Sequence, residues 1–158
     1  EFRLIFVGVP CYPIFRKFND FFTDWKGVFI HSTYLWFASG GSNLGVQYDL
    51  DNPLDSLAEG MLIGVRDAMD SMFHQNIAVK ELLDPYNVDG VIYHPIKSCR
   101  TVSTGLADSR NWMSKETGIP TLLLESDMMD ERVVTPAMMK NRADAFFEGL
   151  ITRKQNLK

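Results

Sequence analysis

Short apolar runs rich in Val, Ile, Leu and Phe alternate along the chain with longer segments of helical period. The runs cover residues 4–9, 28–31, 90–94 and 121–125. Runs that are apolar on both faces are typical of parallel strands buried under helices, and the segments between them leave room for helical crossovers. Because such crossovers are right-handed and buried helices flank the first run, we predict a three-layer α/β domain with strand order 2-1-3-4.

The first and last helical segments have the pattern of helices that cover a core. The first begins near Pro13 and the last at Thr135 and Pro136, because Pro fits the first turn of a helix. Each segment repeats apolar residues at the spacing of one helical face, which predicts that this face is buried. The repeated residues are Ile14, Phe18, Phe21, Phe22 and Trp25 in the first helix, and Met139, Ala143, Phe146, Phe147 and Leu150 in the last.

Further helices are predicted in the middle of the chain. A long apolar stripe starts at Asn52 and Pro53, and its period predicts that it faces a core. A second piece runs to about Pro85, and a later helix follows Cys99 and ends at Gly118, which suits a left-handed cap. The long stripe consists of Leu54, Leu57, Ala58, Met61, Leu62, Val65, Met69, Met72 and Phe73.

Composition and charge exclude several classes of partner. The 158 residues carry a net charge of −4, and the Lys and Arg residues are scattered, whereas a nucleic-acid-binding surface needs clustered basic residues. No apolar stretch approaches the roughly 18 residues of a membrane span. No export signal is visible, so we expect a cytoplasmic protein. The chain opens at Glu1 directly on an apolar run and has no initiator Met, so we interpret it as a piece of a longer protein.

Candidate chemistry lies just beyond the predicted strands, because ligands of open parallel sheets collect at the carboxyl ends of the strands. The chain contains neither a dinucleotide-binding nor a triphosphate-binding glycine motif, and the turn after the first run lacks the hydroxyls of a flavin phosphate site. His31, His74 and His94 have no metal-ligand spacing. His31 and His94 are interpreted either as an acid or base or as strand-end residues with satisfied hydrogen bonds, and the second reading is favoured.

The strongest local signal is Cys99, which follows the third run at the expected start of a helix, between Lys97 and Arg100. Cations and a helix N-terminus both stabilise a thiolate. Such a thiolate can be a nucleophile, a redox thiol or a metal ligand. The opposing interpretation is a small apolar residue at a helix start, and the residues alone do not separate the two. The only other cysteine is Cys11, which follows the first run.

Several motifs in a fixed order resemble the closing region of subunits of the benzoyl-CoA reductase / 2-hydroxyacyl-CoA dehydratase family. The order begins with Asp89-Gly90-Val91-Ile92, His94 and Lys97-Ser98-Cys99-Arg100. It continues with Gly118-Ile119-Pro120-Thr121-Leu122, Glu125, Asp127, Asp130, Arg132 and Arg142-Ala143-Asp144-Ala145-Phe146-Phe147-Glu148. The similarity is strong from Asp89 onward and looser before it.

This resemblance implies that residues 1–158 form a single C-terminal α/β domain of a larger, multi-domain enzyme subunit. Such enzymes of anaerobic metabolism pair two homologous subunits that carry iron–sulfur clusters, and an ATP-hydrolysing activator supplies a low-potential electron. The electron reduces an aromatic acyl-CoA or starts the dehydration of a 2-hydroxyacyl-CoA. The residues present do not distinguish these two reactions, and we expect the fragment alone to be inactive.

The resemblance also assigns site residues. Cys99 matches the cysteine of this domain that binds a 4Fe–4S cluster, and Lys97, Ser98 and Arg100 are expected to act on the cluster through charge and hydrogen bonds. A four-iron cluster needs about three or four thiolates, so no cluster is expected in this fragment with its two cysteines. Cys11 matches no cluster position.

The aromatic loop after the second run carries the remaining candidates. Tyr34 and Trp36, with Phe37, are candidates for a pocket that binds the acyl or aryl group, although packing between domains explains them equally well. For the same reason we expect this loop to belong to an exposed apolar surface that contacts the rest of the enzyme and favours self-association of the fragment.

Two other functions remain open. One is a non-catalytic flavodoxin-like domain that binds a ligand or partner, since one fold hosts many functions. The other is a thiol redox domain that uses Cys11 and Cys99. Two further cysteines upstream of Glu1 would favour the cluster-binding enzyme over the non-catalytic domain. The redox domain predicts a reversible disulfide in the isolated fragment.

Overall fold

The structure is a computed structural model that describes residues 1–38, 48–69 and 72–156. Four parallel strands form its sheet: β1 (Phe2–Gly8), β2 (Gly27–Ser32), β3 (Gly90–His94) and β4 (Thr121–Leu123). Their order is β2-β1-β3-β4, and every neighbouring pair is parallel. The predicted strand order and direction are therefore confirmed.

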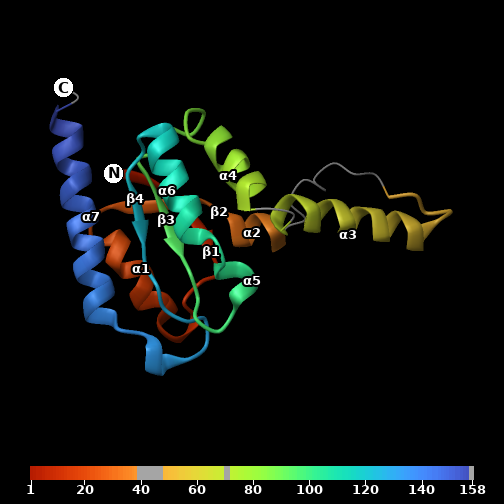
Figure 1. Cartoon of the computed structure of the whole chain (residues 1–158), viewed down its shortest axis with the longest axis horizontal. Coiled ribbons are helices and arrows are strands. Elements are labelled where there is room, and N and C mark those ends of the chain that lie inside the picture. The colour runs from red at the N-terminus through yellow and green to blue at the C-terminus, as the bar shows by residue number, and fades with distance from the viewer. Residues whose placement is uncertain (39–47, 70–71, 157–158) are drawn as a thin grey trace.

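Helices cover both faces of the sheet (Figure 1). Alternate residues of β1 point to opposite faces, as the pleat of a strand requires. Leu4 and Phe6 pack under α1 (Phe15–Thr23) and α7 (Pro136–Asn156). Ile5 and Val7 pack under α4 (Met72–Glu81) and α6 (Leu106–Thr117). The result is a three-layer α/β domain of flavodoxin-like architecture.

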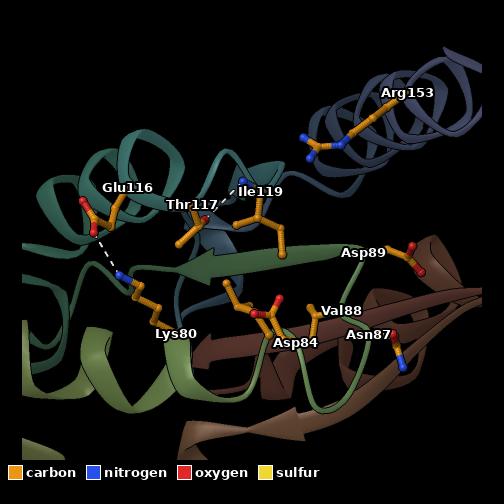
Figure 2. A pocket seen from close by; sticks show the side chains of 10 residues that line it. Lys80, Asp84, Asn87, Val88, Asp89, Glu116, Thr117, Ile119 and Arg153 are labelled. Carbon is orange, nitrogen blue, oxygen red and sulfur yellow. Dashed lines mark hydrogen bonds and ion pairs between the residues drawn. The ribbon is translucent and has the colours of Figure 1, made fainter. Parts of the chain in front are cut away.

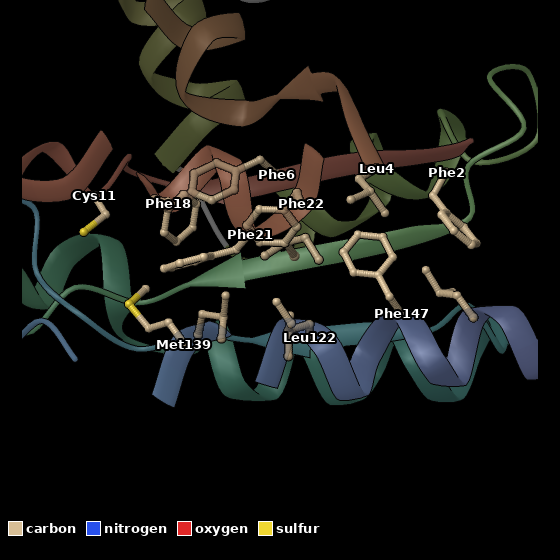
Figure 3. Close-up of a cluster of buried hydrophobic side chains, with 14 residues drawn as sticks. Phe2, Leu4, Phe6, Cys11, Phe18, Phe21, Phe22, Leu122, Met139 and Phe147 are labelled. Carbon is tan, nitrogen blue, oxygen red and sulfur yellow. The ribbon is translucent and has the colours of Figure 1, made fainter. Parts of the chain in front are cut away.

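The core between the sheet, α1 and α7 is rich in aromatic rings (Figure 3). Phe147 of α7 is fully buried, with its ring centroid 5.4 Å from that of Phe2 and 5.7 Å from that of Trp25. The indole Nε1 of Trp25 donates a hydrogen bond of 2.7 Å to Asp144. The predicted apolar residues of the first and last segments thus pack against the same face of the sheet, although Ile14 and Trp25 lie just outside α1.

The long helix α3 (Pro53–Met69) starts where predicted, but the prediction that its apolar stripe faces a core is wrong for the described part. Leu54, Leu57, Met61 and Leu62 are 79%, 51%, 63% and 70% exposed, and Ala58 is exposed as well. Figure 1 shows α3 extending away from the sheet, whose faces are already covered by other helices. The side chains of Val65, Met69, Met72 and Phe73 lie outside the described residues.

The single helix predicted after Cys99 is instead two helices, α5 (Arg100–Ser103) and α6. The break lies at Gly105, whose φ of +81° is a left-handed conformation that interrupts a helix. Gly118, with φ +67°, ends α6 as predicted.

The segment after β2, interpreted from the sequence as a loop, forms the short helix α2 (Thr33–Ala38). The Ser32 hydroxyl accepts a hydrogen bond of 3.5 Å from the Leu35 backbone N–H, which is the contact of an N-cap. Two 3₁₀ turns, η1 (Tyr12–Ile14) and η3 (Glu131–Val133), complete the described elements.

Candidate functional site

The ends of β1, β3 and β4 are tied together by the buried side chain of His94. Its Nδ1 lies 2.6 Å from the Val9 carbonyl oxygen and its Nε2 lies 2.6 Å from the Ser126 hydroxyl. Because a carbonyl can only accept, Nδ1 donates and a neutral Nε2 accepts from Ser126. Burial lowers the pKa of His94, although the Val9 hydrogen bond and Asp127 oppose that shift. Both nitrogens are engaged, so the reading of His94 as a satisfied strand-end residue is confirmed.

A glycine lets these strand ends approach each other. Gly8 has φ +122°, and a Cβ at this position would lie 2.5 Å from the His94 carbonyl oxygen. Any other residue would therefore push the ends of β1 and β3 apart. The Gly8 N–H donates to the Thr33 hydroxyl at 3.3 Å, which links the end of β1 to the start of α2.

The loop that carries Cys99 leaves the sheet at the end of β3. The Lys97 N–H donates to the Ser126 carbonyl at 3.0 Å, and the Ser103 hydroxyl contacts both the N–H and the carbonyl of Ile96 at 2.7 and 2.6 Å. The Cys99 carbonyl accepts from the Ser103 N–H at 3.2 Å. The loop is therefore held on both sides of Cys99.

Cys99 itself is a half-buried free thiol with extended backbone angles, directly before α5. It makes no side-chain capping hydrogen bond. The prediction that a long helix starting at Cys99 stabilises its thiolate is wrong, because α5 has only four residues and the dipole of one helical turn is small. The two flanking cations differ. Lys97 pairs with Glu125 at 3.4 Å, whereas Arg100 is exposed and has no ion pair within the described part of the chain.

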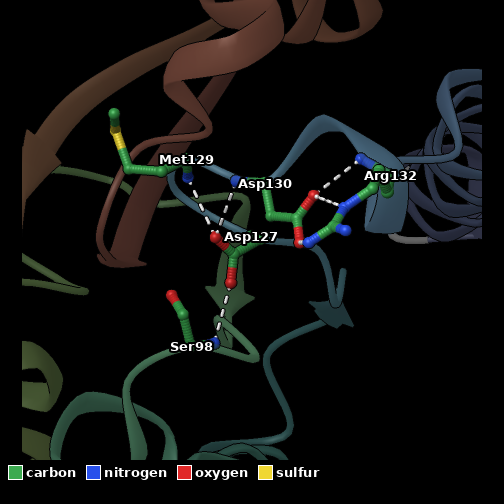
Figure 4. Close-up of polar contacts among 5 residues, drawn as sticks. All are labelled: Ser98, Asp127, Met129, Asp130 and Arg132. Atoms are coloured by element: carbon green, nitrogen blue, oxygen red, sulfur yellow. Dashed lines mark hydrogen bonds and ion pairs between the residues drawn. The ribbon is translucent and has the colours of Figure 1, made fainter.

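Asp127 also lies at the carboxyl edge of the sheet, and the sequence did not reveal its role. One carboxylate oxygen accepts the Ser98 N–H at 2.7 Å, and the other accepts those of Met129 at 2.9 Å and Asp130 at 3.0 Å (Figure 4). The side chain is 1% exposed. These hydrogen bonds, those of Met129 and Asp130 foremost, hold the pKa of Asp127 far below its usual range. An Asp two and three residues before these N–H groups is a known turn signal, but the contact to Ser98 is long-range.

Cys11 lies in a different environment. It is fully buried within the aromatic core cluster, where Figure 3 shows it at the end nearest Phe18. Its interpretation as a buried thiol is confirmed. A thiol that solvent does not reach is poorly placed for exchange with an external partner.

The predicted aromatic candidates gather at the end of β2, and β1 separates that strand from β3. The hydroxyls of Tyr34 and Tyr12 lie 3.1 Å apart, and the ring of Trp36 lies 6.2 Å from that of His31. Tyr34 and Trp36 are half-buried, so each exposes part of its ring. The side chain of Phe37 lies outside the described residues. Desolvation lowers the pKa of His31.

A cavity of about 660 Å³ lies at the opposite end of the sheet, before β3 (Figure 2). Its charged residues are largely paired: Lys80 contacts Glu116 at 2.9 Å, and Asp89 contacts Lys154 at 2.8 Å. None of the site residues predicted from the sequence lines it. The chemistry-bearing side chains and this cavity are therefore in different places, and the strand-end loops remain the candidate site.

Within residues 1–38, 48–69 and 72–156, no three His, Cys, Asp or Glu side chains come close enough together to hold a metal ion. Cys99 thus offers a single thiolate ligand. In the same described ranges, every helix is too short or too polar to cross a membrane.

The parallel sheet and its strand order define the class: a flavodoxin-like α/β domain, here with a half-buried thiol at the carboxyl edge of the sheet. A family model described as 2-hydroxyglutaryl-CoA dehydratase, D-component, matches residues 1–150. The chain therefore belongs to this family, and the resemblance seen in its motifs is confirmed.

Curated relatives agree with this assignment. A benzoyl-CoA reductase subunit from Thauera aromatica is 28% identical over 94% of this chain and 34% of its own length. The alpha subunit of (R)-2-hydroxyglutaryl-CoA dehydratase from Acidaminococcus fermentans is 26% identical over 95% of this chain and 29% of its own length. The alpha subunit of (R)-2-hydroxyisocaproyl-CoA dehydratase from Clostridioides difficile is 25% identical over 98% of this chain and 36% of its own length. The chain thus spans about a third of the length of these relatives.

Proposed function

We propose that this chain is the C-terminal domain of a cytoplasmic iron–sulfur enzyme subunit, in which Cys99 is one thiolate ligand of a 4Fe–4S cluster. The complete enzyme reduces an aromatic acyl-CoA or dehydrates a 2-hydroxyacyl-CoA. Membership of a family of CoA-thioester reductase and dehydratase subunits supports the reaction class. The observation that carries the assignment of Cys99 is its half-buried thiol in a loop held on both sides at the carboxyl edge of the sheet.

The residues around Cys99 fit such a cluster. The thiol is free and engages no backbone N–H as a cap, so it is available to a metal. A bound cluster would supply one-electron transfer, and the other ligands would come from elsewhere in the complete enzyme. Arg100, unpaired among the described residues, would supply positive charge that stabilises a net-negative cluster. Lys97 would contribute less, because Glu125 offsets its charge. The Ser98 hydroxyl would add a hydrogen bond to sulfur.

The partners follow from the same proposal. A homologous second subunit completes the enzyme, an ATP-hydrolysing activator delivers the electron, and a CoA thioester is the substrate. The relatives are themselves named as subunits of enzymes, which supports a partner subunit. The partly exposed rings of Tyr34 and Trp36 are the candidates for contact with the acyl group.

The thiol redox alternative is disfavoured by Cys11, which is fully buried in the aromatic core while Cys99 is in a loop. The structure offers no specific support for a purely non-catalytic domain.

The test compares Cys99→Ala and Cys11→Ala in the full-length subunit, purified without oxygen with its partner subunit. We expect the Cys99 variant to lose most of its iron and sulfide, because a cluster ligand is removed, and to keep its fold. The Cys11 variant is the matched control and should retain its iron, since its thiol faces the core. Equal iron and sulfide contents in the Cys99 variant and the unmodified protein would overturn the proposal.

A further inference from the structure

A backbone hydrogen bond joins the Cys99 loop to the side chain of a buried acid. The Ser98 N–H, one residue before the thiol, donates to Asp127 Oδ2 at 2.7 Å. The two residues lie 29 positions apart, in the loops that follow β3 and β4 (Figure 4). The position of the Cys99 backbone therefore depends on where Asp127 is held.

Asp127 is held firmly. Its Oδ1 accepts the N–H groups of Met129 and Asp130, so the carboxylate is fixed within its own turn. The preceding residue, Ser126, is held by two hydrogen bonds. Its hydroxyl lies 2.6 Å from His94 Nε2, and its backbone N–H donates to the Pro95 carbonyl at 3.2 Å. A chain of buried contacts thus runs from the ends of β3 and β4 to the carboxylate that receives the Ser98 N–H.

We propose that Asp127 is a positioning residue for the Cys99 thiolate, an inference that rests on the proposed role of Cys99 as a cluster ligand. Metal sites require ligands held within fractions of an ångström, and the groups that orient a ligand typically change metal affinity about 10–100-fold when removed. Asp127 is well suited to this role because it is buried and ionised, and an ionised acceptor forms a stronger hydrogen bond to an N–H.

The Asp127→Asn variant removes the hydrogen bond from the Ser98 N–H while it keeps the hydrogen bonds from Met129 and Asp130 within the Asp127 turn. The amide oxygen can replace Oδ1 and accept the two N–H groups of Met129 and Asp130. The amide nitrogen then replaces Oδ2, and its N–H groups oppose the Ser98 N–H, so the hydrogen bond to the loop is lost. The shape of the side chain is unchanged.

Asp130→Asn is the matched control, since it makes the same chemical change three residues away. The Asp130 side chain caps η3 and contacts Arg132, and neither contact reaches the Cys99 loop. Both variants are made in the full-length subunit with its partner subunit. The readouts are the rate of iron loss to a chelator, the reduction potential of the cluster and the thermal unfolding midpoint.

We expect Asp127→Asn to lose iron at least about tenfold faster than the unmodified protein, with a shifted potential, and to lose it faster than any fall in its unfolding midpoint accounts for. Asp130→Asn should lose iron at the unmodified rate. If both variants lose iron at the unmodified rate, Asp127 does not position the ligand. If Asp127→Asn accelerates iron loss only in proportion to a lowered unfolding midpoint, its role is structural and the proposal is likewise wrong.

A second variant covers the case in which Asp127→Asn fails to fold. Ser98→Pro removes the N–H from the opposite side of the same hydrogen bond, and residue 98 is exposed, so the proline ring meets solvent. Its control is Ser98→Ala, which also lacks the hydroxyl but keeps the N–H. Ser98→Pro should lose iron faster than Ser98→Ala, and equal rates in these two variants would overturn the proposal. Cys99→Ala distinguishes failure of the proposed function from failure of the positioning role. If this variant keeps its iron, the proposed function fails. If it loses iron while Asp127→Asn and Ser98→Pro do not, only the positioning role fails.

Discussion

The two longest helices of the described residues, α7 and α3, carry similar apolar periodicity but lie in opposite environments. In α7, Met139, Ala143, Phe147 and Leu150 are buried against the sheet. In α3, the corresponding stripe is exposed along its described part, from Leu54 to Leu62. The helices are 21 and 17 residues long, so length does not explain the difference. A 3.6-residue period identifies which face of a helix is apolar, but not which surface covers that face.

Burial in this molecule follows from the sheet. The face that receives α7 presents Phe2, Leu4 and Phe6 from β1, and α1 closes the same layer. The opposite face is occupied by α4 and α6. Once these helices are in place, both faces are covered, and α3 extends away from the sheet (Figure 1).

The largest effect that we expect is from Phe147→Ala. Its ring is fully buried and contacts Phe2, Phe22 and Trp25. Truncation removes apolar contacts and leaves a cavity, so the free energy of unfolding should fall by about 3–5 kcal/mol. Chemical denaturation of the 158-residue chain measures this. A loss below about 1 kcal/mol would mean that α7 does not pack as described.

A smaller effect concerns pH, because the buried region contains His94. Burial lowers its folded pKa below the ordinary value of 6.5, so between these two values the unfolded chain binds a proton that the folded chain does not. Stability is therefore fully present above about pH 6.5 and falls as the pH drops below it, by at most about 1.4 kcal/mol per pH unit.

This pH dependence is best measured in the His31→Gln variant, because the pKa of His31 is lowered as well. Denaturation between about pH 7.5 and pH 5 avoids the titration of most carboxylates. Constant stability across that interval would show that His94 is not buried in its neutral form.

The smallest effect is expected on α3. Leu62→Ala should change the free energy of unfolding by less than about 0.5 kcal/mol, since the side chain is 70% exposed. The same substitution at Leu150 of α7, which is 2% exposed, should cost about 2–5 kcal/mol. Equal losses at the two positions would show that the α3 face is covered within the chain.

A related experiment addresses what that face does in solution. If the exposed stripe of α3 drives self-association, Leu54→Lys and Leu62→Lys together should lower the apparent mass measured by light scattering. The unfolding midpoint should not change, because neither side chain is in the core. An unchanged mass would place self-association elsewhere, for example at Tyr34 and Trp36.

Much of the site was already visible in the sequence. Strand ends are local features, so the apolar run ending at His94 placed Cys99, Lys97 and Arg100 just beyond a strand. The same runs predicted the parallel sheet and its order, because right-handed crossovers leave few alternatives. The local break at Gly105 was missed, since a glycine within a helical pattern is often tolerated.

Tertiary structure decided the rest, because it depends on contacts between residues far apart in the chain. Asp127 receives the Ser98 N–H across 29 positions, and His94 joins Val9 to Ser126. The tertiary structure also places the two cysteines differently, with Cys11 in the core and Cys99 in a loop, although both follow an apolar run. The sequence determined which faces are apolar and where the strands end. Only packing determined which apolar faces are covered, since a covering surface belongs to other parts of the chain.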